Sequence, residues 1–152
     1  MKKSLLLMGA VLLLTGCGSS ELTKDDITEK NYTNKFECVR TEKMDNGKGE
    51  SKFTKIYDFN EEGTKLLGYY EIATHTYTAD VDMDSEKERY LNACESGKEY
   101  GYINCKVKVD GNTITVTKES DLNHENNKEE ASKMTKESIT KDYEDGEIYT
   151  CQ

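Results

Sequence analysis

The chain of 152 residues contains no proline and no tryptophan, and it has only three phenylalanines and two histidines. Only 34% of the residues are hydrophobic, so a core has to rely on tyrosine, leucine, isoleucine and valine. The length corresponds to one domain. Because a small core that is poor in apolar residues is only marginally stable, we expect covalent cross-links to support it.

Positive charge is also scarce. The chain has 21 basic and 30 acidic residues, which gives a net charge of −9. Lys2 and Lys3 belong to the N-terminal apolar segment, and without them 19 basic residues face 30 acidic ones, for a net charge of −11. Such a surface repels nucleic acids and anionic headgroups. We therefore expect no nucleic-acid partner, and a cationic protein where electrostatics steers an association.

Long hydrophobic runs are missing as well. The apolar run Leu5–Leu14 has about ten residues, whereas a helix that spans a bilayer needs about 20. Two lysines precede this run and small residues follow it, which is the order of a secretory signal peptide. We expect residues 1–16 to be a signal peptide that is removed.

The residues at the end of this segment, Leu14-Thr15-Gly16-Cys17, resemble the lipobox of bacterial lipoproteins at all four positions. The resemblance implies that a diacylglycerol is attached to the sulfur of Cys17 and that the signal is cut before it. It also implies that the new amino group can carry a further acyl chain, such as palmitate. Two or more chains anchor a protein stably, whereas one binds only marginally. The alternative is an ordinary signal peptide that happens to contain a cysteine.

Residues 17–33 are polar and follow neither the helical nor the strand period, so they predict a flexible tether. A coil of this length has an end-to-end distance of about 25 Å. The expected globular domain, residues 34–152, would then lie outside the cell, at the outer face of the cytoplasmic membrane, and we expect it to be monomeric.

The first half of this domain alternates with the period of strands. We expect strands at residues 35–41, 51–60 and 64–80, with a hairpin signal at Asn46-Gly47 and a bulge at Gly68. One face of the second strand carries Phe53, Lys55, Tyr57 and Phe59. These three runs predict an antiparallel meander.

Residues 82–100 change to the helical period. Ser85 and Glu88 predict a capping box, and Tyr90, Leu91 and Cys94 share one face, which would point Cys94 at the core.

A hairpin is predicted for residues 105–116. A two-residue turn at Asp110-Gly111 would place Val109 opposite Asn112, Val107 opposite Ile114, and Cys105 opposite Val116.

The C-terminal part begins with a polar segment, residues 119–132, which we expect to be a loop or a loose helix. Thr135 as N-cap, Met134 and Ile139 as a hydrophobic staple, and Gly146 at the end predict a helix. Tyr149 and Cys151 alternate in a last strand. The expected fold is therefore α+β, a mainly antiparallel β-sheet with two short helices, stapled by disulfides.

The cysteine count supports the disulfides. Of five cysteines, Cys17 is assigned to the lipid, and an exported chain normally pairs the remaining four. Three connectivities are possible, and we predict Cys94 with Cys105 and Cys38 with Cys151. The two loops would contribute about 3 and about 5 kcal/mol. The alternative is four free, buried thiols.

Metal and catalytic signals are weak. Asp80, Asp82 and Asp84 resemble the opening of a calcium loop, but Ser85 stands where the turn glycine belongs and Leu91 where the closing glutamate belongs. Charge at a helix start explains these aspartates better. His75 and His124 lack the spacing of metal ligands. Since no nucleophile elbow or phosphate-binding glycine loop is present, we expect no metal, no cofactor and no enzymatic activity.

One short motif points to a protein partner. Residues 96–100, Ser-Gly-Lys-Glu-Tyr, fit the Ser-Gly-x-x-Tyr pattern of membrane-bound inhibitors of C-type lysozyme, although the second motif of that family, Tyr-x-x-x-Thr-Lys-Gly, is absent. The resemblance implies that Ser96 and Tyr100 contact a partner, and an acidic inhibitor would suit a cationic lysozyme. The alternative is a helix end capped by Gly97.

The whole layout is similar to uncharacterised small lipoproteins of AT-rich Gram-positive bacteria, and distantly to YehR-like lipoproteins. The sequence thus predicts a lipid-anchored extracytoplasmic module for binding or envelope interaction, and it does not specify the molecular activity. A lysozyme-type inhibitor and an enzyme are the alternatives.

Overall fold

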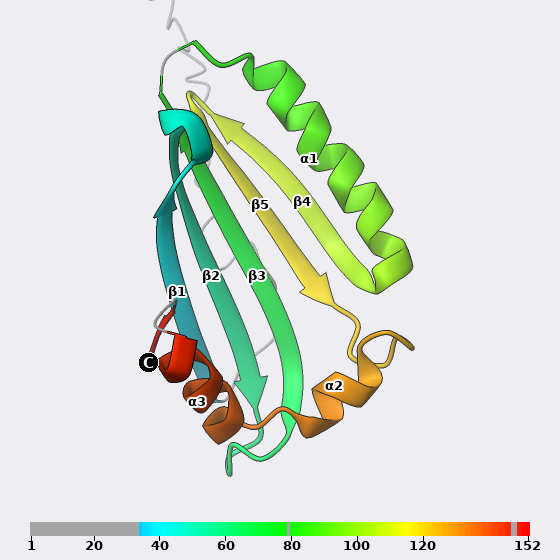
Figure 1. The fold of residues 1–152 in the computed structure, drawn as a ribbon. Helices are drawn as coiled ribbons and strands as arrows, with labels where there is room; N and C mark the ends of the chain where they lie inside the picture. Colours follow the sequence, from blue (N-terminus) through cyan, green and yellow to red (C-terminus); the bar gives the residue numbers. More distant parts are fainter. Residues whose placement is uncertain (1–33, 79, 147–148) are drawn as a thin grey trace, which may run out of the picture.

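The computed structural model describes residues 34–78, 80–146 and 149–152. The predicted signal peptide, Cys17 and the predicted tether lie outside these residues. The described residues form a six-stranded antiparallel sheet with helices, in which α1 runs alongside β4 while α2 and α3 gather where β2 ends (Figure 1).

The strand order across the sheet is β4-β5-β3-β2-β1-β6, and every neighbouring pair is antiparallel. The strands are β1 (Lys35–Lys43), β2 (Gly49–Phe59), β3 (Leu66–Tyr77), β4 (Tyr102–Asp110), β5 (Thr113–Ser120) and β6 (Thr150–Cys151). The helices are α1 (Met83–Gly97), α2 (Lys128–Lys133) and α3 (Lys136–Gly146), with short 3-10 helices η2 (Asp45–Gly47) and η3 (Lys98–Tyr100). The predicted α+β class is confirmed.

The described residues hold three α-helices where two were expected, because part of the polar segment forms α2. Lys133 and Glu129 are one turn apart in α2 and form an ion pair at 2.6 Å. Ala131, on the same short helix, packs against the main core. A helix of this length is not stable alone, and the apolar contact of Ala131 and the ion pair of Lys133 with Glu129 help to stabilise it.

Alternation along the strands places one set of side chains on the face that the helices cover, here called the helix face. On this face Tyr57 of β2 pairs with Phe36 of β1 and with Tyr69 of β3, whose ring lies 4.9 Å from that of Tyr57. The three predicted strands form the expected meander. A register shift between Asp58 and Phe59 lies opposite Gly68, beside the predicted bulge.

The main core lies between the helix face and α3. Its buried residues are Phe36, Cys38, Tyr57, Phe59, Leu66 and Ile139. Burying such a large apolar side chain stabilises the fold by about 1.5–3 kcal/mol. Thr135 caps α3 as predicted, because its Oγ1 accepts a hydrogen bond from the Ser138 backbone N–H at 3.0 Å. Met134 and Ile139 both pack in this core.

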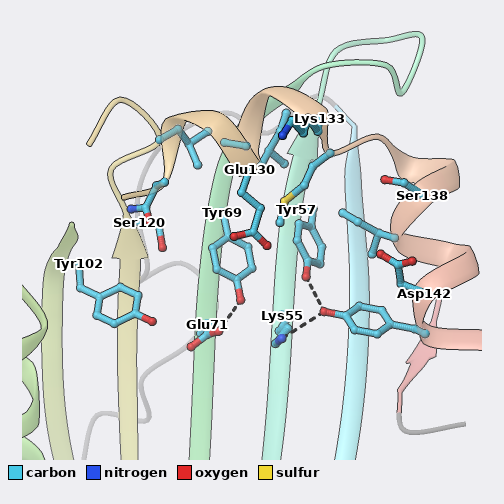
Figure 2. Close-up of a pocket in the computed structure, with 17 residues that line it drawn as sticks. Lys55, Tyr57, Tyr69, Glu71, Tyr102, Ser120, Glu130, Lys133, Ser138 and Asp142 are labelled. Carbon is cyan, nitrogen blue, oxygen red and sulfur yellow. Dashed lines mark hydrogen bonds between the residues drawn. The ribbon is translucent and has the colours of Figure 1, made fainter. Parts of the chain in front are cut away.

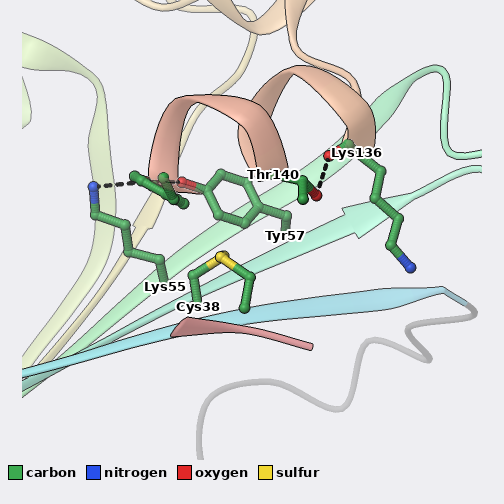
Figure 3. The surroundings of a disulfide bond; sticks show 7 residues. Cys38, Lys55, Tyr57, Lys136 and Thr140 are labelled. Carbon is green, nitrogen blue, oxygen red and sulfur yellow. Dashed lines mark hydrogen bonds between the residues drawn. A yellow bond between two sulfur atoms is a disulfide. The ribbon is translucent and has the colours of Figure 1, made fainter. Parts of the chain in front are cut away.

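Both predicted disulfides are present. Cys38 in β1 is bonded to Cys151 in β6 across 113 residues, and Cys94 in α1 to Cys105 in β4 across 11 residues. Cys38 has no exposed surface and lies below α3, close to Tyr57 (Figure 3). The long loop gives the larger entropic stabilisation, since closing it removes more freedom from the unfolded chain.

The register predicted for the second hairpin is wrong by two residues. Val109 pairs with Ile114 and Val107 with Val116, so the turn residues are Gly111 and Asn112 instead of Asp110 and Gly111. The reason lies in β3, because the Asn112 side-chain amide donates to the Tyr77 carbonyl and the Asn112 carbonyl accepts from the Tyr77 N–H. A shift by two keeps the side chains of residues 106–116 on their predicted faces.

Cys105 does not lie opposite Val116 as predicted. The register of β4 against β5 shifts between Ile103 and Lys106, where Asn104 has a positive φ of 52°. This irregular stretch contains Cys105, which is bonded to Cys94 of α1.

The predicted capping box of α1 is also wrong. Asp82 is the N-cap, and its carboxylate accepts hydrogen bonds from the backbone N–H groups of Asp84 and Ser85. The helix therefore begins at Met83, one turn earlier than Ser85 predicted. Leu91 is 46% exposed, so it does not belong to the face of α1 that packs on the sheet, although the sequence pattern placed it there with Tyr90 and Cys94.

The contact of α1 with the sheet centres on a buried histidine. His75 of β3 is 8% exposed, its Nδ1 lies 2.9 Å from the Ser51 hydroxyl, and its ring stacks on Tyr90 of α1 at 4.8 Å. Burial lowers the pKa of His75, and the nearby Arg89 lowers it further against the opposing effect of Glu86 and Glu42. His75 is thus held neutral where α1 packs.

We expect the protein to lose stability as the pH falls below about 6.5, the usual pKa of histidine. The folded-state pKa of His75 is depressed, so in this range the unfolded chain binds a proton that the folded chain does not. Each unit of depression corresponds to about 1.4 kcal/mol. Urea unfolding between pH 7.5 and 5.5 should show the loss, and His75→Gln should remove most of the pH dependence.

His124→Gln is the matched control, because His124 is the second of the two histidines in the chain. This variant should keep the pH dependence of the wild type. The pKa values of Glu71 and Glu86 are lowered, so the stability that these carboxylates contribute is lost only below about pH 4.5. This loss can therefore be distinguished from the effect of His75. An unchanged slope in His75→Gln would contradict the prediction.

Candidate functional site

A cleft of about 600 Å³ lies between the helix face and the two C-terminal helices. Its floor comprises Lys55 and Tyr57 of β2 with Tyr69 and Glu71 of β3. Residues of α2, α3 and the segment between them form one wall, and Tyr102 at the start of β4 contributes to the other side (Figure 2). We refer to this space as the cleft.

The floor contains charges at positions where a sheet face usually buries apolar side chains. Lys55 of β2 pairs with Glu71 of β3, and Glu71 pairs with Lys118 of β5, which forms a charged row across three strands. Lys118 Nζ lies 2.5 Å from the Glu71 carboxylate, and the Tyr69 hydroxyl donates to the same carboxylate. The Lys118 ammonium also lies 4.0 Å from the centre of the Tyr102 ring.

All three members of the charged row are ionised at neutral pH. Burial acts to raise the pKa of the Glu71 carboxyl, but the hydrogen bond and charge of Lys118 hold it below its usual range. Burial acts to lower the pKa of Lys55, but the hydrogen bond to Tyr143 and the charge of Glu71 outweigh it and raise that pKa. The pKa of Lys118 is raised because its pairing with Glu71 outweighs burial. The row therefore carries one net positive charge.

Lys55 lies at the end of a cluster of hydrogen-bond donors. Its Nζ donates to the Tyr143 hydroxyl at 3.1 Å, and the hydroxyls of Tyr143 and Tyr57 are 2.7 Å apart (Figure 2). Burial and the hydrogen bond to Tyr143 raise the pKa of Tyr57, so it stays protonated. Lys55 forms no ion pair with a carboxylate of the described residues. Because an ammonium has three hydrogens, two remain for another acceptor.

The opening of the cleft is acidic. Glu130 of α2 and Asp142 of α3 are exposed and line the cleft, with Glu130 pointing towards Tyr69 and Tyr57 and Asp142 lying beside α3 (Figure 2). Neither carboxylate is paired with a cation of the described chain. Lys133 lies beside them, but its ammonium is paired with Glu129 at 2.6 Å. The cleft thus has a cation on its floor and two carboxylates at its rim.

The residues of the lysozyme-inhibitor motif lie outside the lining of the cleft. Ser96 is exposed in the last turn of α1, and Tyr100 in η3 is 57% exposed. Gly97 does not provide the left-handed cap that the sequence indicated, since that conformation belongs to Gly101, with φ of 82°. A side chain at Gly97 would meet the Tyr102 ring at 2.6 Å, so packing explains this glycine.

The calcium-like aspartates serve the helix start, where Asp82 caps α1. Within residues 34–78, 80–146 and 149–152, no group of three or more histidine, cysteine, aspartate or glutamate side chains is arranged to hold a metal ion. His75 is buried against Ser51 and Tyr90, whereas His124 lies in the loop that precedes α2. No helix of the described chain has the length and apolar character needed to cross a membrane.

The comparisons do not assign the chain to a group. No protein family, curated protein or solved structure matches it. The geometry of the cleft and the N-terminal sequence are therefore the features that bear on function.

Sequence reasoning did not identify the cleft, although one signal for it was present. The strand pattern placed Lys55 on the same face as Phe53, Tyr57 and Phe59. A charged residue on an otherwise aromatic face is costly to bury and needs a partner or water access. The partner hydroxyl belongs to Tyr143, 88 residues away, so the pattern of the strand alone could not reveal the site.

Proposed function

We propose that the protein is a lipid-anchored extracytoplasmic binding protein whose ligand site is the cleft. The observation that supports this most directly is the half-buried Lys55 ammonium, with two hydrogens to spare, on the floor of a 600 Å³ space lined by tyrosines. Binding sites for small molecules are usually concave and largely apolar, with a few polar groups that converge on the ligand. The cleft is concave, and its lining mixes tyrosine and aliphatic side chains with charged and polar ones such as Lys55, Glu71 and Asn127.

Binding explains the site better than catalysis. A catalytic lysine needs a lowered pKa, and a general acid or base needs a pKa near neutrality. The pKa of Lys55 is raised and that of Glu71 is lowered, so both groups are shifted away from such roles. Burial raises the pKa of Tyr69, which therefore serves as a hydrogen-bond donor to Glu71.

The anchor is proposed from the sequence alone, and Cys17 is its residue. Cys17→Ser should move the protein from the membrane fraction to the soluble fraction, because the sulfur that would carry the diacylglycerol is gone. Fractionation of a bacterial host that secretes the chain measures this, with non-reducing peptide mapping to show that both disulfides remain. A double variant, Cys94→Ala with Cys105→Ala, is the control and should stay in the membrane fraction. Membrane retention of Cys17→Ser at the wild-type level would contradict the anchor.

Ligand binding by the cleft can be tested with the chain from residue 17 onward, carrying Cys17→Ser. After incubation with the small-molecule fraction of a bacterial envelope extract and gel filtration, native mass spectrometry should detect a bound compound. Lys55→Met should reduce its occupancy at least tenfold, because a charge-assisted hydrogen bond is lost at the floor. Lys52→Met is the matched control, since Lys52 is exposed on the same strand and faces away from the cleft. No bound compound, or equal occupancy in Lys55→Met, would refute a ligand site there.

A second candidate function is inhibition of a cationic lysozyme-type hydrolase. The exposed Tyr100 favours it, because an exposed aromatic side chain beside the exposed Glu99 suits a cationic protein surface, whereas Glu95 is already paired with Lys98 at 2.6 Å. A lysozyme assay should then show inhibition that Tyr100→Ala weakens at least tenfold and that Lys55→Met leaves unchanged. If the wild type does not inhibit, this function is removed and the cleft proposal stands.

A further inference from the structure

We propose that the ligand of the cleft is zwitterionic, with a free carboxylate and a free ammonium joined by an apolar body, as in a short unblocked peptide. This inference rests on the proposed function and adds the chemical class of the ligand. It follows from three parts of the cleft, which are the donors on the floor, the carboxylates at the rim and the apolar surface between them.

The floor selects an anion. The cluster of Lys55, Tyr143 and Tyr57 contains three ammonium hydrogens and two hydroxyl hydrogens, and the two bonds within the cluster use two of them. The Lys55 ammonium therefore has donors left, and it accounts for the net positive charge of the row, because Glu71 and Lys118 are paired with each other. A carboxylate accepts several such bonds at once, and charge-assisted bonds of this kind are short and strong. A neutral ligand would bring no negative charge to the Lys55 ammonium, whose electrostatic contacts are the faces of Tyr143 and Tyr149 and the more distant Glu71.

The rim excludes a ligand that is only anionic. Glu130 and Asp142 both line the cleft from its helical wall, and Lys133, near Glu130, is paired with Glu129 (Figure 2). An anion entering the cleft would be repelled by both carboxylates unless it carried a positive group at its other end. A positive group at the rim is attracted by the charges of Glu130 and Asp142, and the tyrosine faces also attract it.

Apolar side chains form a further part of the lining, beside polar residues such as Ser120 and Asn127. Leu66 of β3, Met134 before α3 and Ile139 of α3 line the cleft, together with the rings of Tyr69 and Tyr102. Methionine adapts its shape to different apolar groups, and tyrosine rings offer flat contact area. A volume of about 600 Å³ lies within the range of small-molecule sites. Apolar side chains of a short peptide fit this middle zone.

The test uses calorimetric titration of the chain from residue 17 onward with Cys17→Ser. The first probe is leucyl-leucine, and the comparison probes are its C-terminal amide, its N-acetyl derivative and free leucine. We expect the amide to bind at least tenfold more weakly and the acetylated form several-fold more weakly than the unblocked dipeptide. Tighter binding of the dipeptide than of leucine assigns a peptide, and the reverse order assigns an amino acid.

Variants locate the two ends of the ligand. In Lys55→Met the free and amidated dipeptides should bind equally, because the carboxylate has lost its partner. In the double variant Glu130→Gln with Asp142→Asn, acetylation should no longer matter. Lys52→Met should behave as the wild type. Since the modified ligands are first compared on wild-type protein, the conclusion does not depend on a variant that fails to fold.

Two results would overturn the inference. One is equal binding of the unblocked, amidated and acetylated dipeptides to the wild type. The other is the absence of binding by all four probes although the envelope extract supplies a compound whose capture requires Lys55; in that case the cleft is a binding site for another class of ligand and the proposed function stands. If no compound is captured from the extract either, both proposals fail.

Discussion

The ion pair between Glu71 and Lys118 is the constraint around which the helix face of the sheet is arranged. A charge removed from water is costly unless a partner and further hydrogen bonds compensate it, and here Lys118 and Tyr69 both serve the Glu71 carboxylate. The charged row divides the face into the core beneath α3 and the histidine contact beneath α1. Apolar helix surfaces gain little by closing over charges, so an open space persists beside the row.

The parts of the fold that depend on local patterns were predictable from sequence. Period-two alternation identified the strands around Phe53 and Tyr57, and the Thr135 cap marked the start of α3 because its hydroxyl bonds within one turn. The disulfide pairing followed from counting, since removing Cys17 leaves an even number and the predicted elements bring each pair close. The strands and the cap depend on residues that are close in sequence, and the disulfides had only three possible pairings.

The remaining features depend on contacts between distant segments. The hairpin turn moved to Gly111 and Asn112 because Asn112 bonds to Tyr77 of another strand, 35 residues away. Asp82 is the N-cap of α1, although the sequence predicted a capping box at Ser85. Several acidic and hydroxyl residues near the start of α1 can serve as N-cap, and their spacing does not show which of them does. The cleft requires Lys55 and Tyr143 to meet, which only the completed sheet brings about.

The place where the chain enters the domain has a consequence for where the cleft operates. The Asn34 side chain donates to the Asn60 carbonyl at 2.9 Å, and the Asn34 carbonyl accepts from the Phe59 N–H at 3.1 Å, so β1 starts at the end of the sheet that carries the cleft. If Cys17 carries the proposed lipid anchor, the predicted tether of about 17 residues would reach at most roughly 60 Å. The proposed anchor would then confine the end of the domain that carries the cleft to a layer of that thickness above the membrane surface, so the compounds that the cleft samples would be those of the envelope.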